Sequence, residues 1–400
     1  MTMINTVFLD QVRAELPPVM EEAVKTRRYL HMNPEVGFDT QNTERLVRER
    51  LTLLGIELLP AKMGVMGVIR GQDSSRMVAL RADMDALPIE EENDVPYRSR
   101  CPGKMHACGH DGHTSMLLGA ARLLKAHEKE LPMDVLLIFQ PAEEGPNLGG
   151  ARVMLADLKE KGMAEKIVRI FGLHLFNDYP LGTICAKYGA MASSTDEFDI
   201  TVIGRGGHAG QPHKCIDALS IGAKVITAME SYMSRRMDPF DQAIFSVGIF
   251  QAGSAKNVVA ETARIAGTIR CQREETRAEI LKNMEQIVNG ICSGFGADCR
   301  IDVLHGLPVL VNDKEAVEYS AAVAQQVAGK EHVLMLSAPM MGAEDFAYFA
   351  EAVPASFLWI GSGNPDKGFT HLAHQPKFDF DEDAMANGIQ ILCGLAANMK

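Results

Sequence analysis

Short apolar runs that alternate with helical patterns most constrain how this chain can fold. The run Val135–Phe139 is continuously apolar, and further strand-like runs occupy 64–70, 77–82, 167–173 and 355–361. Such runs are typical of strands that are buried on both faces of a parallel sheet. Apolar residues recur at helical spacing over 9–32, 43–54, 114–127, 150–161, 314–328 and 382–399. This alternation predicts an α/β domain with a largely parallel sheet.

Polar residues follow three of the apolar runs directly. Asp83 and Asp85 follow one run, Glu143 and Glu144 follow the next, and His174 follows a third. Open α/β sheets bind their ligands at the carboxyl ends of the parallel strands. One carboxylate after a strand is usually a turn former or a helix cap. Three strand ends that carry Asp, Glu-Glu and His instead favour a metal site.

The stretch 105–113 contains three histidines, a cysteine and an aspartate ahead of an apolar helix. Cys108 and His110 are separated by one glycine, so a loop can turn both side chains toward one ion. Thiolate and imidazole are good ligands for zinc-like metals. Alternatively, these imidazoles cap the helix N-terminus or lie in water. Two of these histidines, His106 and His113, have no assigned role, and neither has His213.

The sequence pattern changes near Ala190. Alternating strand patterns at 195–204, 243–251, 261–270 and 300–305 and helical patterns at 215–236 and 274–291 follow in the order β-α-β-β-α-β. This order is the ferredoxin-like arrangement. Because the first pattern then returns, we predict a discontinuous metal-binding domain, residues 1–190 and 307–400, with an inserted ferredoxin-like α+β domain at 191–306.

Composition argues against several classes of partner. The 400 residues carry a formal net charge of −12, whereas nucleic acids and anionic membranes require concentrated Lys and Arg. No apolar run approaches the ~20 residues that span a bilayer, and the first residues do not resemble a signal peptide. The eight cysteines have no repeated spacing, as in reduced cytosolic proteins. We expect a cytoplasmic protein with a small-molecule substrate, no nucleic acid and no membrane.

His374 is a further candidate ligand, late in the chain. It precedes a proline and an acidic run, which predicts a surface loop of the first domain. A single histidine in such a loop is more often an ordinary surface residue, and its spacing does not connect it to the other candidates.

With these residues assembled, the chain resembles the metallopeptidase family of aminoacylases, carboxypeptidases and dipeptidases. Within that family it is most similar to the amidohydrolase branch of hippuricase and the hydrolases of indoleacetyl-amino acid conjugates. The resemblance covers nearly the whole chain, and its motifs keep the family's order. They are Tyr29-Leu30-His31 to Pro34-Glu35, Arg81 to Pro88, Met105 to His113, Pro141 to Gly145, Gly172-Leu173-His174, Gly206-Gly207-His208-Ala209, Asn257-Val258-Val259, Glu344-Asp345-Phe346 and His374.

The resemblance implies a role for each matching site residue. It implies two divalent metal ions per subunit, of zinc, manganese, cobalt or nickel. Glu143 matches the general base, and Asp85 matches an aspartate that orients a ligand or tunes the base. The residues that match metal ligands are Cys108, His110, Glu144, His174 and His374.

Residues of the inserted domain match positions associated with substrate. His208 matches a histidine that the family brings to the active site, often from a neighbouring subunit, and Asn257 and Arg270 match positions associated with the substrate carboxylate. Other branches have a metal-binding histidine at the position of Asp83, so the role of Asp83 stays open. The resemblance also implies a homo-oligomer, a dimer or a tetramer.

These inferences lead to one hypothesis and two alternatives. The hypothesis is a dinuclear metal-dependent amidohydrolase that cleaves N-acyl amino acids, either hippurate-like or N-acetyl substrates, with Glu143 as base. One alternative is a dipeptidase or carboxypeptidase of the same family. The other is a metal-binding scaffold without catalysis, although a pure binding site has no need of a spare carboxylate beside the ligand Glu144.

Overall fold

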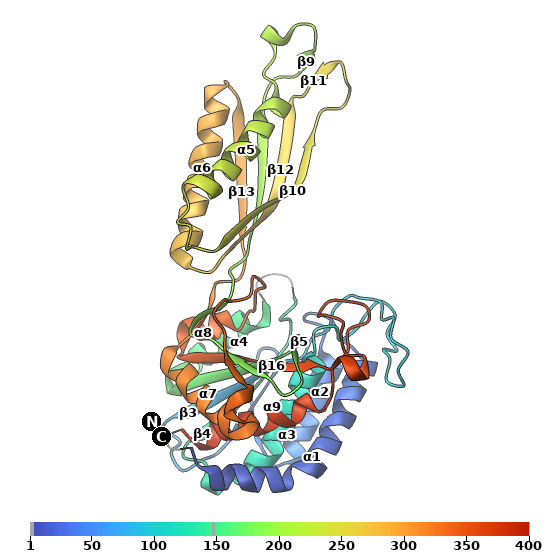
Figure 1. Cartoon of the computed structure of the whole chain (residues 1–400), viewed down its shortest axis with the longest axis vertical. Helices are drawn as coiled ribbons and strands as arrows, with labels where there is room; N and C mark the ends of the chain where they lie inside the picture. The colour runs from blue at the N-terminus through green and yellow to red at the C-terminus, as the bar shows by residue number, and fades with distance from the viewer. Residues whose placement is uncertain (1–3, 146–148, 400) are drawn as a thin grey trace. The chain divides into compact units, whose positions relative to one another are not determined.

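The computed structural model describes residues 4–145 and 149–399, which form two compact units (Figure 1). Unit 1 comprises the described residues of Met1–Met191, Val311–Ala338 and Asp345–Lys400. Unit 2 comprises Ala192–Leu310 and Pro339–Glu344. Unit 1 is therefore built from three separate stretches of the chain, which surround unit 2 in the sequence.

Unit 1 is built on an eight-stranded mixed sheet in the order β1-β2-β4-β3-β5-β16-β6-β15. Its centre, β4-β3-β5-β16, is parallel, whereas antiparallel pairings join β1 to β2, β2 to β4 and β16 to β6. The strands are β1 (Glu57–Leu59), β2 (Val65–Ile69), β3 (Met77–Asp83), β4 (Asp134–Gln140), β5 (Ile167–Pro180), β6 (Ile184–Ala186), β15 (Val333–Met335) and β16 (Ala355–Gly363), with the short strands β7 (Gly189–Ala192) and β14 (Leu310–Asn312) near the unit boundaries in the sequence. The predicted α/β class is confirmed.

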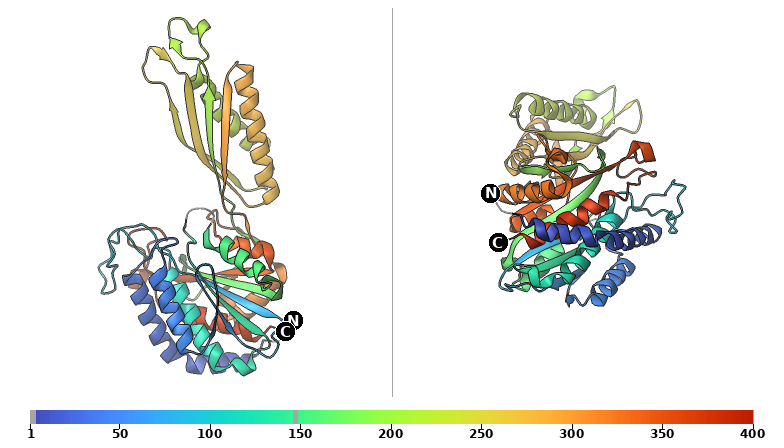
Figure 2. Two further views of the ribbon diagram at one scale, coloured as in Figure 1. Left: turned by 180° about the vertical axis from the view of Figure 1, so that it is seen from behind. Right: turned by 60° about the horizontal axis from the view of Figure 1, so that its bottom comes forward.

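Helices cover both faces of this sheet. Helices α3, α7 and α9 pack on one face with α1 outside them, and α4 and α8 pack on the other (Figures 1 and 2). Every residue of β4 is buried, as the continuously apolar run Val135–Phe139 predicts. The helices are α1 (Thr6–Met32), α2 (Gln41–Leu53), α3 (His110–Ala126), α4 (Gly149–Glu160), α7 (Lys314–Ala328), α8 (Ala347–Ala352) and α9 (Ala384–Ala397).

Unit 2 contains a four-stranded antiparallel sheet in the order β10-β12-β8-β13. Two helices cover one of its faces (Figure 2). In β8, Phe198, Ile200 and Val202 are buried, whereas the residues between them are more exposed, as the alternating pattern predicts. The elements are β8 (Asp196–Ile203), β9 (Gly207–His208), α5 (Ala218–Arg235), β10 (Ala243–Ala252), β11 (Val258–Val259), β12 (Thr262–Cys271), α6 (Glu274–Gly294) and β13 (Asp298–His305).

Two element boundaries near the candidate ligands differ from the sequence prediction. Strand β5 continues to Pro180 because β16 pairs with it beyond His174, so that histidine lies inside the strand and not after its end. Helix α3 begins at His110, four residues earlier than predicted. Gly109 makes this start possible, because its φ of 90° is a left-handed conformation that favours glycine.

The described part of the chain lacks a helix with both the length and the apolar character needed to cross a membrane. All eight cysteines lie within the described residues, and all are free thiols.

His127, at the end of α3, provides a test of the electrostatics of unit 1. Its ring nitrogens lie 2.9 Å from Glu130 and 3.1 Å from Glu15. Burial lowers the pKa of His127, but the hydrogen bonds to these carboxylates outweigh burial, so the pKa is raised. A histidine whose pKa is raised on folding stabilises the fold fully below its unfolded pKa of about 6.5. That stabilisation is lost as the pH rises through the folded pKa.

We therefore expect the His127→Gln substitution to lower the free energy of unfolding more at acidic than at alkaline pH, by about 0.5 kcal/mol. Urea denaturation of both proteins across a pH series measures this difference. If the substitution lowered the free energy of unfolding by the same amount at every pH, the loss would come from the ring contact of His127 with Phe8 and not from the charge of His127.

Candidate metal centre

Asp85 joins three segments of unit 1 that carry candidate ligands. Its carboxylate oxygens accept the backbone N–H groups of Glu143, at 2.9 Å, and of Glu144, at 3.0 Å. Its backbone carbonyl accepts a hydrogen bond from Nδ1 of His110 at 2.9 Å. Asp85 therefore connects the loop after β3, the loop after β4 and the first turn of α3. Its side chain is fully buried, so water does not compete for these hydrogen bonds.

Two histidines are oriented by backbone carbonyls so that Nε2 stays available. Nδ1 of His174 donates to the carbonyl of Leu175 at 2.7 Å, and Nδ1 of His110 donates to that of Asp85. Metal-binding histidines usually make this second hydrogen bond, which fixes the tautomer. Nε2 of His110 is buried and has no hydrogen-bond partner among the described residues. Nε2 of His174 lies 3.3 Å from Sγ of Cys108.

The loop that carries His374 also lies against the candidate ligands. Nε2 of His374 lies 2.7 Å from Oε1 of Glu144, and its backbone N–H donates to the carbonyl of Ala107 at 2.7 Å. Among the described residues, the non-glycine residues with positive φ are His374, at 67°, and Ala142, at 56°. Such conformations cost free energy and cluster at functional sites. Both flank the candidate ligand Glu144, Ala142 in sequence and His374 in space.

The five predicted metal ligands and Glu143 come together in unit 1. Their ligand atoms lie within 4.8 Å of one another in three overlapping groups: Cys108 with His110 and His174, Cys108 with Glu144 and His374, and His110 with Glu143 and Glu144. Thiolate, imidazole and carboxylate are the donors that zinc-like ions take in proteins. The orphaned, buried Nε2 of His110 and this donor set both fit a divalent metal site.

Charges at the cluster also favour a bound cation. Hydrogen bonds to Cys108 and Glu144 raise the pKa of His374 to about 10. Burial would lower the pKa of His110, but the charge of Asp83 and neighbouring hydrogen bonds raise it well above its ordinary value. Burial opposes ionisation of Glu144, yet the hydrogen bond from His374 lowers its pKa. The carboxylates therefore attract positive charge to the places where a divalent cation would bind.

His113 lies close to these ligands but has no free lone pair. Its Nδ1 donates to Oδ1 of Asp83 at 2.6 Å, and its Nε2 accepts the backbone N–H of Leu175 at 2.9 Å. Burial lowers the pKa of His113, which keeps the ring neutral. Asp83, His110 and His113 are near enough to share an ion, but both nitrogens of His113 are already engaged. We therefore exclude His113 as a ligand.

Asp83 belongs to a buried network behind the ligands. Its second oxygen accepts a hydrogen bond from Arg81 at 2.5 Å, and Arg81 also donates to Asp345 and to Gln140, each at 2.8 Å. Asp345 in turn accepts hydrogen bonds from the Gln140 side chain and from the backbone N–H of Ala151. Asp83 thus connects this network to His113 and, through Leu175, to the strand that carries His174.

The motifs of the resemblance include Arg81 and Asp345, but sequence reasoning assigned neither residue a role in the site. Arg81 carries a charge inside the otherwise apolar run of β3, and its side chain is buried. A charged residue within a buried strand needs a charged partner. That pattern is the signal from which Arg81 could have been recognised as part of a buried ion-pair network. Nothing near Asp345 in the sequence identifies Arg81 as its partner.

The predicted substrate-binding residues lie in unit 2 and do not all come together. His208 on β9 pairs with Val258 on β11, and the backbone N–H of Ala209 donates to the carbonyl of Asn257, so His208 and Asn257 are neighbours. Arg270 lies near the other end of β12, where it donates to the carbonyl of Met341 at 3.3 Å.

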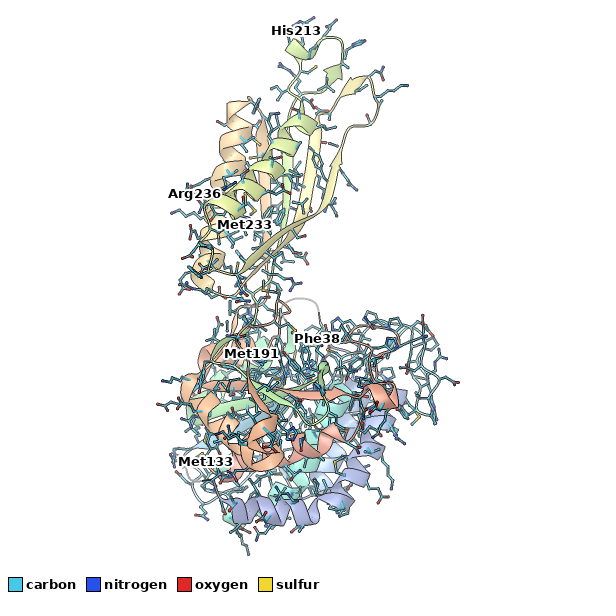
Figure 3. All side chains as sticks on the ribbon, viewed as in Figure 1. Phe38, Met133, Met191, His213, Met233 and Arg236 are labelled. Carbon is cyan, nitrogen blue, oxygen red and sulfur yellow. The ribbon has the colours of Figure 1, made fainter. Side chains whose placement is uncertain are left out.

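Two of the unassigned histidines lie outside the ligand groups. His213 is exposed at the end of unit 2 that carries β9 and β11 (Figure 3). His106 is buried in unit 1, and neither of its ring nitrogens has a hydrogen-bond partner in the described part of the chain. Burial lowers the pKa of His106 to about 3, so its ring is neutral.

The chain is similar to known proteins in sequence and in fold. Residues 79–398 match the family model described as Peptidase family M20/M25/M40. N-acetylcysteine deacetylase from Bacillus subtilis (strain 168) is 36% identical over 376 residues, covering 93% of this chain and 95% of that protein. Thermostable carboxypeptidase 2 from Saccharolobus solfataricus is 35% identical over 387 residues, covering 95% and 96%. The crystal structure of Bacillus subtilis YXEP protein, described as a dinuclear metal binding peptidase from the M20 family, matches with a TM-score of 0.82 and 32% identity, covering 95% of this chain and 98% of that one.

The hydrogen bonds of Asp85 can be tested by the Asp85→Asn substitution. Asparagine replaces one accepting oxygen by an amide group that cannot accept, so the N–H of Glu143 or Glu144 loses its partner. We expect the free energy of unfolding to fall by roughly 1–3 kcal/mol, and the affinity for Co²⁺ to fall with it. Urea denaturation and competition with a chelator measure the two quantities.

Asp134→Asn is the matched control for this substitution. Asp134 is buried at the opposite end of β4, where it accepts the backbone N–H of Gly71 at 2.9 Å. This variant should lose stability and keep its affinity for Co²⁺. If Asp85→Asn also kept its affinity for Co²⁺, Asp85 would have no part in positioning the ligands.

Proposed function

Because the chain belongs to peptidase family M20/M25/M40, a family of hydrolases, we propose that it is a metal-dependent amidohydrolase that cleaves N-acyl amino acids. The observation that carries this proposal is the pair Glu143 and Glu144. Glu144 lies in the ligand groups with Cys108 and His374, and Glu143 is fixed beside it by Asp85. The pair provides a carboxylate for metal binding and a second carboxylate for proton transfer.

We assign metal binding to Cys108, His110, Glu144, His174 and His374, which would hold two divalent ions between them. Bound divalent ions supply a Lewis acid for the amide carbonyl and lower the pKa of an attacking water. The candidate metals are zinc, manganese, cobalt and nickel, and the softness of the Cys108 thiolate favours zinc among them.

Glu143 is the proposed general base. Its backbone is held by Asp85, and its half-buried carboxylate accepts the N–H of Asp345 at 3.4 Å. Glu143 would take a proton from the attacking water and later pass it to the nitrogen of the leaving amine. Asp85 acts in this scheme as a positioning residue, because its contacts to the base and the ligand pass through backbone atoms.

His208, Asn257 and Arg270 are the proposed substrate-binding residues. Nδ1 of His208 accepts the backbone N–H of Gly210 at 2.9 Å, so the neutral ring carries its proton on Nε2. That N–H can donate to a substrate carboxylate or to a developing oxyanion. The exposed amide of Asn257, the residue before β11, can donate to the same group. A homo-oligomeric assembly and a cytoplasmic location remain predictions.

A carboxypeptidase or dipeptidase is the second candidate function. The name of thermostable carboxypeptidase 2 supports it, and the name of N-acetylcysteine deacetylase supports the acyl-amino-acid substrate. The identities to the two relatives are similar, so they do not decide between the functions. A metal-binding scaffold is less well supported, because it gives no role to the carboxylate of Glu143.

The experiment that tests the proposed function is a substrate comparison with and without metal. The purified chain is given N-acetyl amino acids, N-benzoyl amino acids and dipeptides at equal concentrations. We expect hydrolysis of one of the acyl substrates, its loss on chelation, and its recovery with Mn²⁺, Co²⁺, Ni²⁺ or Zn²⁺. Hydrolysis of dipeptides alone would favour the peptidase, no hydrolysis would favour the scaffold, and unchanged activity after complete removal of metal would contradict the proposed mechanism.

The role of Glu143 is tested by Glu143→Gln. Glutamine keeps the size of the side chain but cannot accept the proton of water, so we expect kcat to fall by roughly 10²–10⁴-fold. The bound metal, measured by elemental analysis, should stay unchanged. Glu160→Gln, at a surface residue that pairs with Lys62, should keep normal kcat. Normal turnover in the Glu143 variant would remove it as the base.

A further inference from the structure

Arg27 on α1 is a buried cation that the proposed chemistry does not use. Its side chain is inaccessible to solvent, and it lies two residues before the motif Tyr29-Leu30-His31. A buried guanidinium needs several acceptors, because its transfer from water is costly. The hydrogen-bond partners of Arg27 therefore show which segments of the chain are held together around its side chain.

The partners of Arg27 come from two distant segments of unit 1. Nε donates to Oδ2 of Asp111 at 2.9 Å, and Nη2 donates to Oδ1 of Asp379 at 2.6 Å. Nη1 lies 3.3 Å from Oε1 of Glu382. The planar guanidinium binds these three carboxylates at once through a fork of three nitrogens, which the single ammonium group of a lysine cannot reproduce.

Two of these carboxylates, Asp111 and Asp379, adjoin segments that carry proposed metal ligands. Asp111 directly follows His110 in the first turn of α3, and its second oxygen accepts the backbone N–H of Gly112. Asp379 lies at the end of the loop that carries His374. The side chain of Asn177 holds this loop at both ends, because it donates to the carbonyls of His371 and Asp379 at 2.8 and 2.7 Å. Arg27 therefore connects the segment of one ligand to the segment of another.

Aromatic packing makes this connection rigid. The guanidinium carbon of Arg27 lies 4.4 Å from the ring centroid of Phe380 and 4.9 Å from that of Tyr97. Phe380 also packs on the first turn of α3, since a Cβ added at Gly112 would lie 2.6 Å from its ring. Tyr97 donates to the second oxygen of Asp379 at 2.7 Å. The separation of α3 from the loop after His374 is thus fixed by packing as well as by charge.

His31 extends the connection to a third segment. One ring nitrogen lies 2.8 Å from the Asp111 oxygen that Arg27 binds, and the other lies 3.2 Å from Oε1 of Glu91. Glu91 in turn accepts the backbone N–H of Ser99. Asp111 is held in one orientation by Arg27, His31 and Gly112 together, which also limits the freedom of the adjacent His110.

We propose that Arg27 is a positioning residue that sets the separation of the His110 and His374 segments and thereby determines the affinity for metal. This inference rests on the proposed metal site. Without the guanidinium, Asp111 and Asp379 would be buried carboxylates that lack their shared counter-ion and repel each other. The two ligand segments would then move apart.

Co²⁺ binding tests this proposal, because a Cys108 thiolate bound to Co²⁺ gives a charge-transfer absorption band in the near ultraviolet. The variants are Arg27→Gln, which removes the charge, and Arg27→Lys, which keeps the charge and loses the fork. We expect Arg27→Gln to weaken Co²⁺ binding by roughly 10–100-fold in competition with a chelator, with a shifted band. Arg27→Lys should lie between this variant and the wild type.

Arg277→Gln in unit 2 is the control for loss of stability alone. Arg277 binds both oxygens of the buried Asp196 at 2.7 Å. This variant should show a lower thermal unfolding midpoint and unchanged Co²⁺ affinity. A folded Arg27→Gln protein with the affinity and band of the wild type would overturn the proposal.

If Arg27→Gln does not fold, Asp379→Asn decides the question. It keeps the contact of Arg27 with Asp111 and weakens the contacts of Asp379 with Arg27 and Tyr97, so its Co²⁺ affinity should fall by a smaller factor. Unchanged affinity in this variant would also overturn the proposal. A wild-type chain without a thiolate band would instead contradict the proposed metal site itself.

Discussion

The candidate metal centre depends on the hydrogen bonds of one buried residue, Asp85. Its carboxylate accepts the backbone N–H groups of Glu143 and Glu144, and its carbonyl orients the ring of His110. The proposed base Glu143, the proposed carboxylate ligand Glu144 and the proposed imidazole ligand His110 are thereby held in place without a metal ion. Such preorganisation matters because ligands that are already oriented need not be ordered at the moment of binding.

Much of this arrangement could be predicted from the sequence. The carboxyl ends of neighbouring parallel strands meet at one edge of a sheet, so Asp85 after β3 and Glu144 after β4 had to lie close together. The Cys-Gly-His spacing places Cys108 and His110 close together, and in the structure they lie on either side of the N-cap Gly109 of α3. The two-residue alternation of β8 and the order of elements predict a ferredoxin-like unit, which the structure has.

Other features depend on contacts that the sequence does not contain. His113 and His174 are both buried, and residue type alone does not show which of them binds a metal ion. The backbone N–H of Leu175 occupies Nε2 of His113, whereas the Leu175 carbonyl holds Nδ1 of His174 and leaves its Nε2 available. Likewise, Arg27 and Asp379 are 352 positions apart, and only the folded chain shows that they form a pair.

The most direct test of the proposed metal centre is the anomalous diffraction of crystals grown with Co²⁺. We expect two anomalous peaks, each next to ligand atoms from the set Cys108, His110, Glu144, His174 and His374. Nδ1 of His110 and Nδ1 of His174 should still donate to backbone carbonyls. A cobalt ion bound by Asp83 and His113, or the absence of cobalt from the five predicted ligands, would contradict the assignment.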